Sequence, residues 1–128
     1  MEHAARYEDV KIPLRDPVHG LSELSGVLGI PEWWPTGARI GVVLSHGANS
    51  DMNDPLLKAI QKKLTDSGYL TIRFNFPYAE AKKKKPDDTV ILEDAYGSAL
   101  GLLARDPTAA PAHIFVGGMH LGARIVAN

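Results

Sequence analysis

The sequence has 128 residues, enough for one domain, and its composition argues against several classes of protein. Fourteen basic and fifteen acidic residues leave a net charge of -1, which favours neither a nucleic-acid backbone nor an anionic membrane as a partner. There is no cysteine, so disulfides and thiolate chemistry are excluded. The first residues are polar, and no uncharged run reaches the roughly 18 residues that cross a bilayer. We therefore expect a soluble, cytoplasmic protein without a membrane or nucleic-acid partner.

Two short strands are predicted near the start of the chain. Val10, Ile12 and Leu14 alternate with charged residues, the period of a half-buried strand, and a second strand is plausible over residues 23–32. Because the two are short and close in sequence, we expect an antiparallel pair at a sheet edge. Residues 33–38 form a predicted loop whose tryptophans lie against the body of the protein.

From Ile40 the pattern changes to that of an α/β protein. The run "IGVVLSHG", residues 40–47, is typical of a strand buried on both faces in a parallel sheet. Asp54 followed by Pro55 predicts the start of a helix that ends near Gly68. Its apolar stripe consists of Leu56, Leu57, Ile60 and Leu64.

The same alternation continues to the last residues. A strand is predicted over "YLTIRFNFPY", residues 69–78, and the lysine-rich loop 81–88 after it is interpreted as a solvated charge run. Residues 88–105 form a helix in which Gly97 and Gly101 permit close approach to a sheet or neighbouring helix. The remaining predicted elements are a strand over 113–118 and the start of a helix over 120–128.

This order of elements predicts one α/β domain over residues 1–128, with a mostly parallel sheet, an antiparallel leading pair and helices on both faces. In open parallel sheets, ligands and reactive groups gather beyond the carboxyl ends of the strands. Two histidines occupy such positions: His46 follows the first buried strand, and His120 follows the last.

The glycine cluster "GGMHLGAR" around His120 matches one of three motifs. Met119 breaks the dinucleotide fingerprint GxGxxG, which excludes that motif. A phosphate loop needs lysine and then serine or threonine after Gly122, and the sequence "GGMHLGAR" has neither there. The spacing Gly118-x-His120-x-Gly122 fits the nucleophile elbow GxSxG, with histidine in place of serine.

Residues 20–128, with "VVLSHGANSDMNDPLL" and "IFVGGMHLGAR", resemble the amino-terminal half of a small α/β-hydrolase of the dienelactone-hydrolase-like branch. The resemblance implies a truncated α/β-hydrolase fold, an incomplete domain over 1–128, and an ester or acyl hydrolase lineage. It also implies that His46, Gly47, Ala48 and Asn49 form the oxyanion loop, which His46 shapes without being the catalytic base. The oxyanion would be held by the N–H of Ala48 or Asn49 and by that of Leu121.

Two departures from this family argue against ordinary esterase turnover. His120 stands at the nucleophile position, and the acid and base of the triad would follow the elbow in strands that the 128 residues lack. His120 is interpreted mainly as an inert substitution, with a histidine nucleophile or a ligand-binding group as alternatives. A metal site from His46 and His120 would lack a third ligand, so we expect neither metal nor cofactor.

Two classes of function therefore remain open. The chain belongs to the hydrolase lineage and acts only with a complementing carboxyl-terminal half, or it is a noncatalytic module that binds a small acyl or ester ligand or a protein. In either case we expect the strand before His120 to be an open apolar edge, which a partner or a second copy covers.

Several other polar residues have a functional and a structural interpretation. Asp51, Asn53 and Asp54 suggest calcium, but the loop lacks the later glycine and glutamate, so capping by Asp54 is the simpler interpretation. Arg73 beside Asn75 either binds an anionic substrate or is an ordinary surface arginine. The remaining histidines are His113, expected on the opposite edge of the sheet, and His3 and His19, expected to be exposed.

Overall fold

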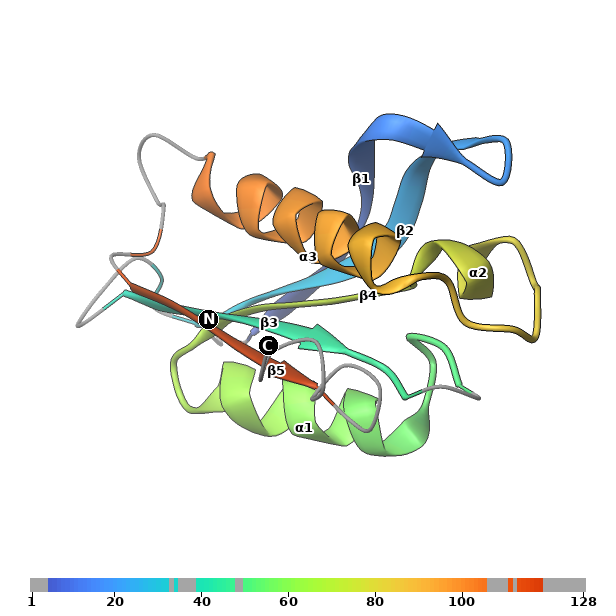
Figure 1. Cartoon of the computed structure of the whole chain (residues 1–128). Coiled ribbons are helices and arrows are strands. Elements are labelled where there is room, and N and C mark those ends of the chain that lie inside the picture. Colours follow the sequence, from blue (N-terminus) through green and yellow to red (C-terminus); the bar gives the residue numbers. More distant parts are fainter. Residues whose placement is uncertain are drawn as a thin grey trace.

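The computed structural model describes residues 5–32, 34, 39–47, 50–105, 111 and 113–118. A five-stranded sheet with the order β1-β2-β4-β3-β5 lies between helix α3 on one face and helix α1 on the other (Figure 1). The elements are β1 (Arg6–Val18), β2 (Leu21–Ile30), β3 (Ile40–Ser45), α1 (Pro55–Asp66), β4 (Leu70–Phe74), α2 (Pro77–Glu80), α3 (Thr89–Ala104) and β5 (His113–Gly118). The predicted α/β class, with helices on both faces, is confirmed.

The leading antiparallel pair is confirmed, with β1 at the edge of the sheet. β1 is longer than the sequence pattern indicated, whereas β2 has the predicted length but begins and ends two residues earlier. The two strands join through a tight turn at His19 and Gly20, which have φ values of 54° and 78°. β2 then pairs antiparallel with β4, so the hairpin is fixed to the parallel part of the sheet. Trp34 packs against the hydrophobic core as predicted.

β3 is buried between two parallel neighbours, as its continuous apolar sequence predicts. It pairs with β4 on one side and with β5 on the other. Val43 is fully buried and Leu44 is 5% exposed. Since side chains of a strand alternate between faces, Val43 and Leu44 fill the core on opposite faces of the sheet.

The buried face of α1 differs from the predicted stripe. Its buried residues are Leu57, Gln61 and Thr65, whereas Leu56 is 56% exposed. The polar members of this face are satisfied, because Gln61 Nε2 donates to the Val27 carbonyl at 2.9 Å and the hydroxyls of Thr65 and Thr71 lie 2.8 Å apart. Buried polar groups with hydrogen-bond partners can therefore take core positions that an apolar pattern does not reveal.

The expectation that Gly97 and Gly101 permit close packing of α3 is wrong. Among the described residues, a Cβ built on Gly97 would meet nothing within 4 Å, and one on Gly101 would meet only Arg105 Nη2, at 3.8 Å. The helix packs instead through a face that includes Ala95 and Ala99, both fully buried. Because each residue turns the helix by about 100°, Gly97 lies roughly 200° from Ala95, on the opposite side.

The predicted strand over 69–78 is shorter in the structure. β4 ends at Phe74, and Pro77 begins the four-residue helix α2, which the sequence analysis missed. Proline fits this first helical position because it lacks the N–H that the first turn leaves unpaired. Phe76, predicted within the strand, lies between the two elements and is fully buried.

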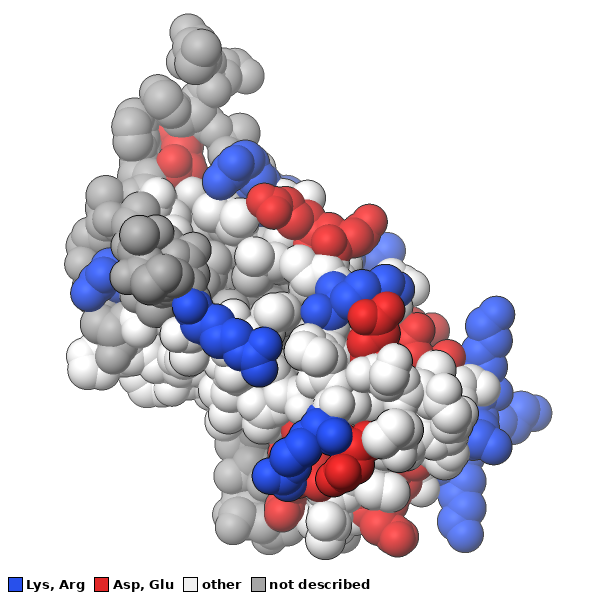
Figure 2. Space-filling model, turned by 90° about the horizontal axis from the view of Figure 1, so that it is seen from above, with Lys and Arg blue, Asp and Glu red and all other residues white. Residues whose placement is uncertain are grey.

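Charges of both signs lie on the surface that carries α3 (Figure 2). Figure 2 shows basic and acidic side chains side by side over this face. Lys82, Lys83, Lys84 and Lys85 lie exposed in the loop between α2 and α3, in agreement with a solvated charge run. Among the described residues, no helix combines the length and the hydropathy needed to span a bilayer.

Candidate active site

Three strands end together at one edge of the sheet. In the parallel registers, Ser45 at the end of β3 is opposite Phe74 of β4 and opposite Gly118 of β5. The residues after each strand therefore begin at the same edge, although they come from distant parts of the sequence. The residues that directly follow Ser45 and those that directly follow Gly118 therefore start at neighbouring strand ends.

The buried side chain of His46 links the ends of β3 and β4 by hydrogen bonds. Its side chain is fully buried, Nδ1 lies 2.8 Å from the Gly47 carbonyl oxygen, and Nε2 accepts the backbone N–H of Phe76 at 3.1 Å. Since Nε2 is the acceptor, Nδ1 carries the proton and donates to Gly47. Burial lowers the pKa of His46, while the bond to Gly47 and the charges of Asp51 and Asp54 act in the opposite direction.

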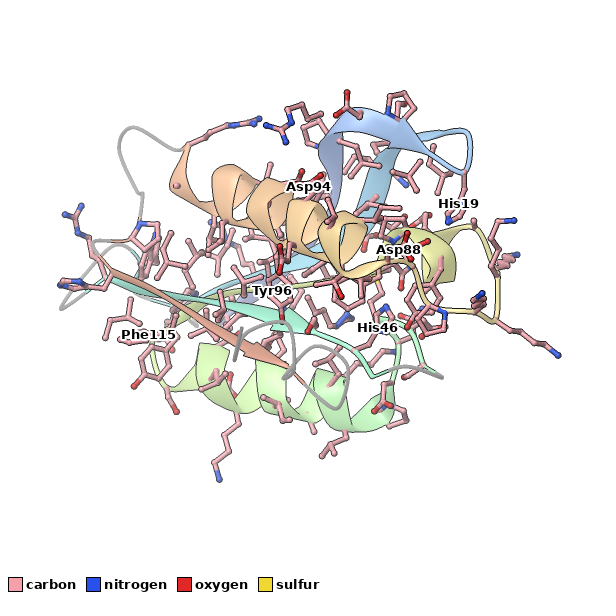
Figure 3. All side chains as sticks on the ribbon, viewed as in Figure 1. His19, His46, Asp88, Asp94, Tyr96 and Phe115 are labelled. Carbon is pink, nitrogen blue, oxygen red and sulfur yellow. The ribbon has the colours of Figure 1, made fainter. Side chains whose placement is uncertain are left out.

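His46 thus makes the structural contacts expected of a loop-shaping residue, at the position shown beyond the end of β3 in Figure 3. Both ring nitrogens are occupied by backbone groups, which leaves neither for proton transfer or a metal in this conformation. Within the described part of the chain, no group of three histidine, aspartate or glutamate side chains could hold a metal ion. The assignment of His46 to an oxyanion loop stays a prediction.

An aromatic cluster supports the backbone after His46. The His46 ring makes edge contacts with Phe76 and Tyr78, at centroid distances of 5.0 and 5.7 Å. Tyr78 also donates from its hydroxyl to the Gly47 carbonyl at 3.3 Å. Burial, together with the charge of Asp87, raises the pKa of Tyr78 to about 12, so its hydroxyl remains a protonated donor.

The segment between this loop and α1 is held by side chains, with Asp54 as the helix cap. Asp54 Oδ1 accepts the N–H groups of Leu56 and Leu57 at 2.8 and 3.3 Å, and its Oδ2 accepts the Ser50 hydroxyl at 2.9 Å. The bond from Ser50 is the largest cause of the lowered pKa of Asp54. Asp51 Oδ1 accepts the N–H of Asn53 at 2.7 Å. The capping interpretation of this acidic segment is confirmed.

Asn75 and Glu80 form a polar network at the end of β4 that the sequence analysis did not find. Asn75 Oδ1 accepts the N–H of Met52 at 2.8 Å, and its Nδ2 donates to Glu80 Oε1 at 3.2 Å. Glu80 also accepts the N–H and the hydroxyl of Ser25 at 2.8 and 3.0 Å. A polar residue directly after a parallel strand and before Pro77 was the available signal, because such positions face the functional edge.

Arg73 lies apart from this network and is not an ordinary surface arginine. Its Nε and Nη1 are buried and have no hydrogen-bond partner among the described residues. Burial lowers the pKa of Arg73, whereas the charges of Asp9 and Tyr7 on β1 raise it. Burial therefore has the largest effect on Arg73, and the groups on β1 oppose it.

The other histidines in the described ranges lie away from the edge where β3 and β5 end. His113 pairs with Ile40 at the start of β5, on the opposite edge as predicted. His19 is in the exposed hairpin turn, but its Nε2 lies 2.6 Å from Asp87 Oδ1, a contact that the sequence did not predict. Asp87 Oδ2 also accepts the N–H of Tyr78 at 2.8 Å, so the hairpin turn and α2 share one carboxylate.

The elbow itself can be located only in part. β5 ends at Gly118, the first glycine of the predicted elbow. The other predicted elbow and oxyanion residues lie outside the described residues: Ala48, Asn49, His120, Leu121 and Gly122. Their roles stay predictions, as does the helix expected after the elbow, and His3 is outside the described ranges as well.

Solved structures of several hydrolases resemble this chain. A dienelactone hydrolase from Anabaena variabilis matches with a TM-score of 0.76 and 18% identity, covering 97% of this chain and 56% of that protein. An α/β serine hydrolase homologue from Coxiella burnetii gives 0.74 and 20%, covering 94% and 55%. A Pyrococcus furiosus esterase gives 0.71 and 24%, covering 94% and 44%.

These similarities establish the fold, and the chain spans about half the length of the first two solved structures. The dienelactone hydrolase and the serine hydrolase homologue thus share this part of their fold with the chain. The family described as "Alpha/beta hydrolase domain" matches residues 38–128, which include β3, β4, β5 and the glycine cluster. The chain is therefore a member of the α/β-hydrolase family and corresponds to a dienelactone-hydrolase-like portion of that fold.

Proposed function

We propose that this chain supplies the oxyanion loop and the nucleophile turn of an ester or acyl hydrolase site, and that the 128 residues alone do not turn over esters. The observation that supports this proposal is the β3–β5 register, in which Ser45 is opposite Gly118. In this register the His46 loop and the elbow sequence begin at the carboxyl ends of two neighbouring strands. A small acyl or ester ligand bound there would contact both segments.

In this proposal, backbone N–H groups hold the negative charge that develops on the carbonyl oxygen of the substrate. The resemblance assigns these donors to Ala48 or Asn49 and to Leu121. A helix beginning near Leu121 would direct its positive end toward the same oxygen. These N–H groups would bind an acyl ligand even if the elbow carries no nucleophile.

The proposed lack of turnover follows from the residue at the elbow. An imidazole at position 120 has no hydroxyl for a base to activate, and the family order places the triad acid and base after the nucleophile. Loss of triad members typically lowers the rate by about 10⁴- to 10⁶-fold, leaving the background of the oxyanion site. We thus expect hydrolysis only when serine is restored and a carboxyl-terminal half supplies the other two groups.

The test is complementation. His120→Ser and His120→Ala variants are each co-expressed with the polypeptide encoded downstream of Asn128, and p-nitrophenyl ester hydrolysis is measured. Turnover in the complex with His120→Ser, but not in the complex with His120→Ala, supports the proposal. Alanine fits the same turn but provides no nucleophile. A correctly folded complex that remains silent with serine supports the alternative below.

The alternative is a noncatalytic module that binds a partner through β5, and the exposure of β5 favours it. In the described part of the chain, β5 pairs with β3 only, while Phe115 is 59% and Val116 is 36% exposed. Figure 3 shows Phe115 projecting outward from the strand. Unpaired edges with apolar side chains recruit further strands. A complementing half or a second copy would fit this edge.

Sedimentation of the purified chain tests the alternative. We expect a concentration-dependent dimer that Phe115→Glu abolishes, with exposed Tyr7 as the site of the matched control, Tyr7→Glu. A monomer at all concentrations, or an equal loss of the dimer in both variants, would count against self-association.

We also propose that the protein is cytoplasmic, since a chain without cysteine suits a reducing compartment. Cell fractionation tests this.

A further inference from the structure

The Gly47 carbonyl oxygen accepts two side-chain hydrogen bonds. His46 Nδ1 lies 2.8 Å from it, and the Tyr78 hydroxyl lies 3.3 Å from it. These donors come from different elements, because His46 follows β3 and Tyr78 belongs to α2. A carbonyl oxygen has two lone pairs, so both acceptor sites of Gly47 are used inside the protein.

We propose that Tyr78 is a positioning residue of the candidate site: its hydroxyl, together with His46, keeps the Gly47 carbonyl turned into the protein and away from the catalytic edge. The inference rests on the proposed function. A carbonyl oxygen that faced the developing oxyanion would repel it. In a trans peptide the N–H points opposite to the C=O, so the proposal requires the N–H that follows the Gly47 carbonyl to face the catalytic edge. Oxyanion sites require donors in that orientation.

Tyr78 is itself held firmly enough to act in this way. It is 2% exposed, its ring stacks on Phe76 at a centroid distance of 6.3 Å, and it meets the His46 ring edge-on. Its backbone N–H donates to Asp87 Oδ2 at 2.8 Å. Asp87 also contacts His19, which ties the start of α2 to the β1–β2 turn. The hydroxyl of Tyr78 therefore approaches Gly47 from a fixed scaffold.

Two buried tyrosines allow a matched test of this role. Tyr78→Phe removes the hydroxyl next to Gly47, whereas Tyr96→Phe removes the hydroxyl of another buried tyrosine, which bonds to Ser45 Oγ. The first readout is the ¹³C resonance of the Gly47 carbonyl in the full chain, because a carbonyl that loses a hydrogen bond becomes more shielded. The ring ¹⁵N shifts of His46 are recorded in the same samples to check the fold around it.

We expect an upfield shift of the Gly47 carbonyl in Tyr78→Phe only, with the His46 ring in the same tautomer throughout. An unchanged resonance in Tyr78→Phe, or an equal shift in Tyr96→Phe, overturns the proposal. Misfolding is recognised by loss of the His46 tautomer signature. In that event the wild-type chain is used: a Tyr78 hydroxyl proton that exchanges slowly with solvent at neutral pH supports the role, and one in fast exchange overturns it.

The second readout is kinetic and uses the complemented His120→Ser protein. A direct oxyanion donor typically contributes about 10²- to 10³-fold to kcat, so a group that only orients the backbone should contribute less, roughly three- to tenfold. We expect Tyr78→Phe to lower kcat by that factor at unchanged KM, and an unchanged kcat overturns the proposal. Absence of hydrolysis with Tyr78 intact instead refutes the proposed function, while the carbonyl resonance still decides whether Tyr78 holds Gly47.

Discussion

His46 and Phe76 are joined across the end of the sheet by a hydrogen bond in which the buried Nε2 of His46 accepts the backbone N–H of Phe76 at 3.1 Å. The opposite ring nitrogen contacts the Gly47 carbonyl at 2.8 Å. One imidazole thus satisfies two buried backbone groups on two different connections. The position that resembles an oxyanion loop is also a structural joint between β3 and β4.

Replacement of His46 should therefore be costly. His46→Ala leaves the N–H of Phe76 without its partner and opens a cavity, so we expect the free energy of unfolding to fall by about 2–5 kcal/mol. His113→Ala is the matched control, because His113 is exposed at the start of β5 and its loss should change stability by less than about 0.5 kcal/mol. Urea denaturation of both variants measures the difference. Equal destabilisation by His46→Ala and His113→Ala would contradict the role of His46 as the link between β3 and β4.

The same histidine predicts a pH dependence of stability. Burial lowers the pKa of His46 in the folded state, so below about 6.5 the unfolded chain binds a proton that the folded chain does not. Stability from His46 is complete above the unfolded pKa and is lost as the pH falls through the folded pKa. The slope should approach 1.4 kcal/mol per pH unit at most.

Urea titrations between pH 7.5 and 5 measure this slope in wild type and in His46→Gln. The glutamine variant should be less stable at neutral pH but flatter over this range. Lowered carboxyl pKa values, such as that of Glu80, act with the same sign in a more acidic window. They are common to both proteins and cancel in the comparison. Parallel slopes would show that His46 is not the group responsible.

The fold was predictable from sequence where one physical signal dominated. A strand buried on both faces is continuously apolar, so residues 40–47 indicated β3, and alternation of apolar and charged residues indicated β1. Errors arose where tertiary contacts override the pattern. Gln61 and Thr65 take core positions on α1 because hydrogen bonds satisfy them, and Gly97 lies on an open side of α3.

The site was predictable only in its backbone outline. Glycine spacing and strand ends placed His46 and Gly118 at one edge, because parallel strands end together. Tyr78 and Glu80 could not be assigned in the same way, since both belong to the short helix that begins at Pro77. A four-residue helix has too few residues to show periodicity.

The cap of α1 gives a further prediction. Asp54→Ala removes the acceptor for two orphan N–H groups and for the Ser50 hydroxyl, so the first turn of α1 should fray. We expect faster amide hydrogen exchange at Leu56 and Leu57 and a lower unfolding midpoint. Asp54→Asn keeps a side-chain acceptor and should retain most of the protection. Asp66→Ala, which breaks only an exposed pair with Lys62, is the control.

Glycine substitutions separate tight packing in β2 from open space on α3. A Cβ at Gly29 would lie 2.6 Å from the Thr65 hydroxyl oxygen, which bonds to that of Thr71. Gly29→Ala should thus lower the free energy of unfolding by about 1–3 kcal/mol. Gly97 is inside α3 and a Cβ there meets no atom of the described residues within 4 Å, so Gly97→Ala should raise stability by roughly 0.5–1 kcal/mol.

Thermal and urea unfolding of the two alanine variants measure both signs under the same conditions. The unfolded chain loses similar freedom in each, so the difference between them reports the folded surroundings. Destabilisation by Gly97→Ala would mean that another segment or a bound partner covers this side of α3 in solution. That result would redirect the search for a binding surface from β5 to α3, because the small residue would then mark a close contact.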